Sequence, residues 1–115
     1  MPVIKVWCLP SMTEKQLRKL HRDIVEAVTL VKELGLKDET EMTCLFPSDM
    51  MSYGFGEEII VEVTGLFEKP ERTDEVRNLL AMFLGGAVRK RFPQARIECF
   101  IFPFNPKQGF WSTPR

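Results

Sequence analysis

The sequence lacks an excess of charge of either sign. Of its 115 residues, 16 are lysine or arginine and 16 are aspartate or glutamate, so the formal net charge at pH 7 is zero. This balance provides no general electrostatic attraction for nucleic acid or for an acidic membrane, and we expect neither as a partner. The basic run at 89–91 is instead expected at the carboxyl end of a helix, where cations interact favourably with the helix dipole.

Long apolar runs and paired cysteines are also lacking. No apolar stretch is long enough to cross a bilayer, and no segment has the pattern of a signal peptide, which together predict a cytoplasmic protein. The three cysteines are odd in number and show no C-x-x-C spacing. This pattern argues against a disulfide framework and against a zinc site.

Strands are predicted where β-branched and aromatic residues alternate with others. Four segments meet this description: 3–9, 41–46, 58–66 and 96–102. The second and fourth are each followed by a proline, which is expected to end the strand. The sequence therefore predicts four strands, two in each half of the chain.

Two helices are predicted between these strands, because apolar residues recur three and four positions apart. Thr13 and Gln16 form a capping-box pattern at the start of the first helix, and Gly35 is expected to end it. The second helix is expected to begin at Thr73 or Arg72 and to end at 92–93, Phe-Pro. The resulting fold class is α+β: two β-α-β units form a four-stranded sheet with two helices on one face.

The two β-α-β units resemble each other at an offset of 60 residues. Thr13 corresponds to Thr73 and Leu20 to Leu80, and the second strands end in LFP and IFP. We interpret 1–115 as a single domain with an internal repeat, about 1–47 and 57–103. Each unit is expected to be a right-handed crossover between parallel strands.

The two faces of the predicted sheet differ in character. One face is apolar, includes all three cysteines and is expected to lie under the helices, where the thiols act as small hydrophobic groups. The opposite face carries Trp7, Phe100 and Phe102 beside charged side chains. Monomers seldom leave such an apolar patch open, so a second subunit is expected to cover this face.

Pro2 directly precedes the first strand. A proline is tolerated there because its missing N–H costs no hydrogen bond of the sheet. Removal of Met1 would give Pro2 a second property, a free secondary amine, which is a base.

Four stretches of the sequence, MPVIKV, LGLKDETEM, VEVTGLFEKPERTDE and QGFW, carry a resemblance to the tautomerase superfamily. It covers essentially the whole chain. In length the chain is most similar to members like macrophage migration inhibitory factor and 5-carboxymethyl-2-hydroxymuconate isomerase. The resemblance implies a tautomerase fold, a homotrimer, and keto–enol isomerisation of a small carboxylated enol or 2-oxo acid. Neither a metal nor an organic cofactor is needed.

The same resemblance implies roles for particular residues. Pro2 would be the general base, and Arg72 and Lys37 would bind the substrate carboxylate. Phe110 and Trp111 would wall the pocket or pack across a subunit interface. A backbone N–H at 64–65, Thr-Gly, would face a developing enolate. Cations near Pro2, with Lys5 counted among them, would favour the neutral, basic form of the amine.

The chain also departs from the family pattern at two places. Ser11 and Met12 stand where the 4-oxalocrotonate tautomerases have an arginine, and Cys99 falls near the position of a pocket asparagine in the migration factors. Two alternatives to an enzyme therefore remain: a tautomerase fold without activity, and a ferredoxin-like module that binds a small molecule. The order of the strands in the sheet distinguishes the ferredoxin-like module from the tautomerase fold. Tautomerases place the two strands of each β-α-β unit side by side, whereas ferredoxin-like sheets split them.

Several candidate residues also have ordinary structural interpretations. Arg72 and Lys37 could be solvated side chains. His21 is expected at the surface or the boundary of the first helix. Tyr53 could be a pocket lid or a turn residue.

Overall fold

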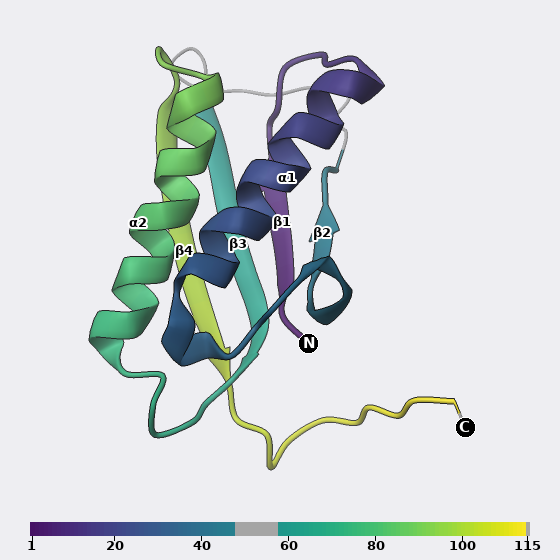
Figure 1. The fold of residues 1–115 in the computed structure, drawn as a ribbon, viewed down its shortest axis with the longest axis vertical. Coiled ribbons are helices and arrows are strands. Elements are labelled where there is room, and N and C mark those ends of the chain that lie inside the picture. Colours follow the sequence, from purple (N-terminus) through teal and green to yellow (C-terminus); the bar gives the residue numbers. More distant parts are fainter. Residues whose placement is uncertain (48–57, 115) are drawn as a thin grey trace.

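One face of a four-stranded sheet carries both helices (Figure 1). The computed structural model describes residues 1–47 and 58–114, so Tyr53 lies outside the described residues. The helices and strands are β1 (Val3–Trp7), α1 (Glu14–Leu30), β2 (Thr43–Leu45), β3 (Glu58–Phe67), α2 (Asp74–Arg91) and β4 (Arg96–Phe104), with short 3-10 turns at Lys32–Leu34 and Glu39–Glu41. The predicted α+β class is confirmed.

The strands follow the order β2-β1-β3-β4. β1 pairs in parallel with β2, β3 pairs in parallel with β4, and β1 and β3 pair antiparallel at the centre. The two strands of each β-α-β unit are therefore neighbours. A ferredoxin-like sheet splits these strands, so the ferredoxin-like alternative is wrong.

The helix boundaries follow from the capping signals in the sequence. The Thr13 hydroxyl accepts a hydrogen bond from the Gln16 backbone, and the Gln16 side chain accepts one from the Thr13 backbone, which confirms the capping box. At the start of α2, the Thr73 hydroxyl accepts a hydrogen bond from Val76 N–H. Gly35 adopts a φ of 70° and closes the 3-10 turn that follows α1 rather than α1 itself.

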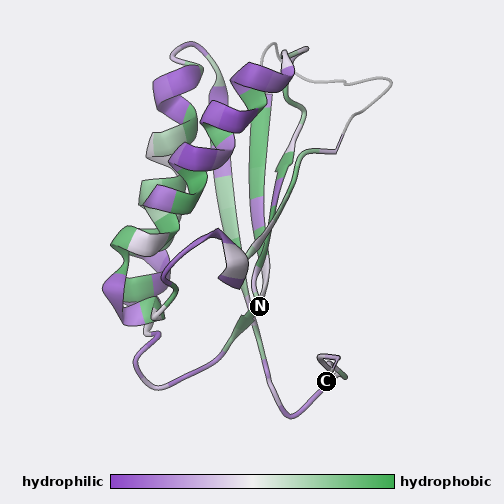
Figure 2. Ribbon diagram, turned by 45° about the vertical axis from the view of Figure 1, so that its right-hand side comes forward, coloured by the Kyte–Doolittle hydropathy of each residue, from purple (hydrophilic) through white to green (hydrophobic). Residues whose placement is uncertain are grey.

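The core lies between the sheet and the helices. Buried residues alternate along β1 and β3, and the buried stripes of α1 and α2 pack over them. Figure 2 shows the hydrophobic character of the strands and the alternation of hydrophilic and hydrophobic residues along both helices. Neither helix in the described part of the chain has the length and apolarity needed to span a membrane.

Several strand bounds differ from the prediction. β2 covers Thr43–Leu45 rather than 41–46. β1 ends at Trp7 rather than at residue 9, because Cys8 adopts a φ of 65°, and Cys8 lines a cavity on the uncovered face of the sheet instead of lying under the helices. β4 continues to Phe104, beyond the proline expected to end it. Pro103 is tolerated because β4 is an edge strand and a proline there loses no essential ladder bond.

The face of the sheet opposite the helices also carries large apolar side chains. A cavity of about 540 Å³ on this face is lined by Trp7, Cys8, Ile60, Glu62, Phe100 and Phe102. Phe100 and Phe102 are 44% and 49% exposed. The register sets Lys5 opposite Glu62, and Trp7 Nε1 donates a hydrogen bond to the Glu62 carboxylate. We call this surface the open sheet face.

Candidate functional site

A cavity of about 320 Å³ lies at the end of the sheet where β1 begins and β3 ends. Its walls are Met1, Pro2, Leu36, Thr40, Glu41, Gly65, Phe67, Lys69 and Arg72. Because β1 and β3 are antiparallel, with Val3 paired to Thr64, the start of one strand meets the end of the other here. The cavity therefore collects the amino terminus, the end of β3 and the loop that follows it.

Pro2 is buried in the wall of this cavity. Its carbonyl accepts a hydrogen bond from Thr43 N–H at 2.9 Å, which attaches the amino terminus to the start of β2. Met1 precedes it, so the Pro2 nitrogen is an amide in this structure. The geometry brings Pro2 and Arg72 to one cavity.

Gly65 shapes the cavity beside Pro2. It adopts a φ of 69° at a register shift between Val63 and Leu66, a position at which a bulge favours glycine. A Cβ atom at this position would lie 3.1 Å from the Met1 carbonyl oxygen. A side chain here would be strained by the positive φ and would require the Met1 carbonyl to shift by a few tenths of an ångström.

Arg72 is 6% exposed and is the buried charged residue of the described chain. Its Nη1 donates to the Phe67 carbonyl and its Nη2 to the Leu34 carbonyl, both at 2.8 Å. Burial lowers the pKa of the guanidinium, and the charge of Glu71 opposes the shift. Arginine stays protonated at neutral pH even so, and Arg72 therefore brings a fixed positive charge to the wall of the cavity.

The lysines around the site are arranged differently from the expectation. Lys37 is exposed and does not line the cavity, although its backbone N–H donates to the Glu41 carboxylate at 2.8 Å. Lys5 lies on the open sheet face and does not line it either. Lys69 does line the cavity. Sequence reasoning missed Lys69, for which the only signal was a cation three positions before Arg72.

The 3-10 turn at Glu39–Glu41 delivers two polar residues to the cavity, Thr40 and Glu41. The turn is fixed by Asp38, whose carboxylate accepts hydrogen bonds from the Thr40 hydroxyl and the Thr40 backbone N–H. These bonds lower the pKa of Asp38, with the side-chain bond as the larger cause. Sequence reasoning began the second strand at Glu41 and singled out neither residue for the site.

The two aromatic residues of the tail have different surroundings. Trp111 packs on Phe67, a wall of the cavity, with 4.8 Å between ring centroids, and it also contacts Phe104 at 6.4 Å. Phe110 is 90% exposed. Within one chain, Trp111 therefore contacts a wall residue but does not line the cavity itself. Phe110 extends into solvent.

Two of the cysteines behave as packing groups. Burial raises the pKa of Cys44 to about 11 and that of Cys99 to about 12, so both thiols are protonated at neutral pH. His21 is partly buried and meets the edge of Phe46, as expected for a residue at the boundary of α1. Over residues 1–47 and 58–114, no group of three or more His, Cys, Asp or Glu side chains is arranged to hold a metal ion.

Comparison with known proteins finds similarity at the level of structure. No family model matches the chain, and no curated protein matches its sequence. The chain is similar to macrophage migration inhibitory factor of Toxoplasma gondii, with a TM-score of 0.67 and 17% identity over 94% of this chain and 95% of that one.

Two further solved structures are similar. Malonate semialdehyde decarboxylase gives a TM-score of 0.64 and 14% identity, over 98% of this chain and 92% of that one. A fused 4-OT described as a symmetric trimer gives a TM-score of 0.69 and 16% identity, over 93% of this chain and 89% of that one. All three proteins are members of the tautomerase superfamily. The tautomerase fold expected from the sequence is thus confirmed.

Proposed function

We propose that this chain with the tautomerase fold is a cytoplasmic isomerase that moves a proton within a small carboxylated enol or 2-oxo acid. The observation that carries the proposal is the place of Pro2, buried in the wall of a cavity that also holds Arg72 and Lys69. An amino-terminal proline supplies a secondary amine once Met1 is removed. The cavity supplies the positive charge that an acidic substrate requires.

The proposed reaction balances without a co-reactant. The neutral Pro2 nitrogen takes the proton from the enol oxygen, the carbonyl double bond forms, and the protonated proline returns the proton to the carbon. Two features of the site favour the neutral amine at the start. Burial disfavours an ammonium ion, and Arg72 and Lys69 in the wall disfavour it further, against the opposite effect of Glu41 in the same wall.

The residues around Pro2 are proposed to bind and orient the substrate. Arg72 supplies positive charge at the wall, and Lys37 is proposed to approach from the exposed segment before the Glu39–Glu41 turn. Trp111 supports the Phe67 wall. Phe110 is proposed to line a pocket only across a subunit boundary, because it extends away from its own chain.

We propose a homotrimer assembled through the open sheet face. The helices cover one side of the sheet (Figure 1). Phe100 and Phe102 are exposed on the open sheet face. The solved fused 4-OT is described as a symmetric trimer, which supports the same arrangement here.

The test compares two amino-terminal forms of the protein, each verified by intact mass. One form lacks Met1, and the other carries a non-cleavable extension before Pro2. We expect the first form to convert enol phenylpyruvate to the keto form and the extended form to be at least about 10²-fold slower, the lower end of what a general base contributes. Ultraviolet absorbance follows the conversion, and circular dichroism verifies that both forms fold.

Equal rates from the two forms would contradict the proposal. Binding of the acid without conversion by the Met1-free form would instead favour the alternative, a tautomerase fold that has lost activity.

A further inference from the structure

The guanidinium of Arg72 is engaged by the protein's own backbone. Its two terminal nitrogens donate to Leu34 and Phe67 carbonyl oxygens, and its Nε has no hydrogen-bond partner among the described residues and is buried. Two of the five guanidinium N–H groups of Arg72 are therefore bound to the backbone around the cavity, and these two contacts hold the side chain in place.

The two carbonyls that Arg72 holds belong to different walls. Leu34 closes the 3-10 turn after α1, two residues before Leu36 in the cavity wall, and Phe67 ends β3 and lines the cavity itself. These segments are 33 residues apart in the sequence and are joined by one side chain. Arg72 therefore ties the segment after α1 to the end of β3.

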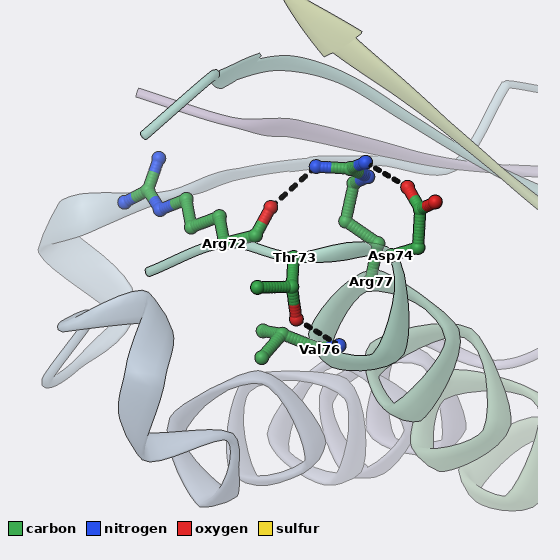
Figure 3. A network of polar contacts seen from close by, with 5 residues as sticks. All are labelled: Arg72, Thr73, Asp74, Val76 and Arg77. Carbon is green, nitrogen blue, oxygen red and sulfur yellow. Dashed lines mark hydrogen bonds and ion pairs between the residues drawn. The ribbon is translucent and has the colours of Figure 1, made fainter. Parts of the chain in front are cut away.

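The backbone of Arg72 is fixed in turn at the start of α2. Arg77 donates to the Arg72 carbonyl and pairs with Asp74, while the Arg72 guanidinium points away from this network (Figure 3). Arg72 N–H donates to the Lys69 carbonyl at 2.9 Å. The turn 69–72 is thus held at both ends, and Lys69 is held with it.

Lys69 is the cation of this cavity that remains free to meet a ligand. Its side chain is exposed, lines the cavity, and forms no salt bridge within 4.0 Å to any described residue. An ammonium group on a flexible stem can reach a carboxylate as a point charge without a fixed fork geometry.

We propose that Lys69 contacts the substrate carboxylate and that Arg72 is a positioning residue that holds the two walls and the turn bearing Lys69. The inference rests on the proposed function for the identity of the ligand, a small 2-oxo acid. The sequence resemblance implies that Arg72 and Lys37 both bind the carboxylate. In this proposal Lys69 makes that contact, and Arg72 holds Lys69 and the cavity walls in place.

Equilibrium binding of phenylpyruvate and of its methyl ester tests the role of Lys69, because the two probes differ in one negative charge. We expect the wild type to prefer the acid, and Lys69→Met to lower affinity for the acid about tenfold while changing affinity for the ester less than twofold. Lys69→Arg should restore the preference. Lys15→Met, which removes an exposed charge on α1, is the matched control and should leave both affinities unchanged.

The opposite pattern overturns the assignment. A wild type that binds both probes equally, a preference that survives Lys69→Met, or a preference that is lost in Lys37→Met instead, would each show that Lys69 does not make the contact.

Arg72→Lys tests the positioning role, since lysine keeps the charge but has one terminal nitrogen in place of the two that donate to the Phe67 and Leu34 carbonyls. We expect a lower Tm and a similar loss of affinity for the acid and the ester. A selective loss for the acid at unchanged Tm would show that Arg72 contacts the carboxylate directly. If this variant does not fold, the Lys69 series decides the proposal by itself.

The binding experiment also distinguishes the contact made by Lys69 from the role of Pro2 as a base. Pro2→Ala should retain the preference for the acid while losing turnover. Turnover that persists in Pro2→Ala would contradict the proline base and leave the Lys69 contact standing.

Discussion

Replacement of Pro2 by alanine is expected to lower kcat/KM for enol–keto conversion by about 10²–10⁴-fold, the usual contribution of a general base. Alanine leaves a primary amine with a different basicity and without the ring that fixes the nitrogen in the wall. The Pro2 carbonyl, which accepts from Thr43 N–H, is present in either residue, so the start of β1 should remain attached to β2. We therefore expect Pro2→Ala to lose catalytic activity and to keep its fold.

Steady-state kinetics on the Met1-free proteins measures this loss. Pro10→Ala is the matched control, because Pro10 is an exposed proline that follows the other end of β1. It should retain wild-type kcat/KM. Equal rates for wild type and Pro2→Ala would remove the proline from the mechanism.

The second large effect is expected at the open sheet face. Substitution of both Phe100 and Phe102 by lysine should dissociate the proposed trimer, because each buried phenylalanine contributes about 1.5–3 kcal/mol and a buried unpaired ammonium is costly. Light scattering should show the mass fall from three times the chain mass of 13.3 kDa to the chain mass itself.

Met82→Lys is the control for this substitution. Met82 is a 64% exposed hydrophobic residue on α2, in a groove between the helices and away from the open sheet face. This variant should remain a trimer. A wild-type protein that is monomeric at micromolar concentration, or a double variant that stays trimeric, would contradict assembly through the open sheet face.

The sequence predicted the parts of the fold that depend on local signals. Thr13 and Thr73 cap the helices through hydrogen bonds to residues three positions along the chain, and the alternation in β3 marks its buried side. Such signals involve neighbours in the sequence. The boundaries that failed depend on other features: Cys8 takes a backbone conformation rare for its residue type, and Pro103 is accepted because β4 lies at an edge.

The candidate site was predictable only in part for the same reason. The place of Pro2 follows from its position before a strand at the centre of the sheet. The engagement of Arg72 does not, because its two acceptors are Phe67, five residues away, and Leu34, 38 residues away. Lys69 and Glu41 enter the cavity from a loop and a 3-10 turn, segments without a periodic pattern. The internal repeat, about 1–47 and 57–103, stays a prediction.

We propose that removal of Met1 leaves the Pro2 nitrogen a free amine whose pKa lies below that of an ordinary α-amino group. Direct titration of the ¹⁵N-labelled Pro2 nitrogen by NMR tests it in the purified protein. We expect one titration below the ordinary range of about 7.7–8.0, with kcat/KM rising as pH increases through the same value and level above it, since the neutral amine is the active form. A nitrogen that titrates at or above that range, or one that stays acylated by Met1 and does not titrate, would show that Pro2 is not the base.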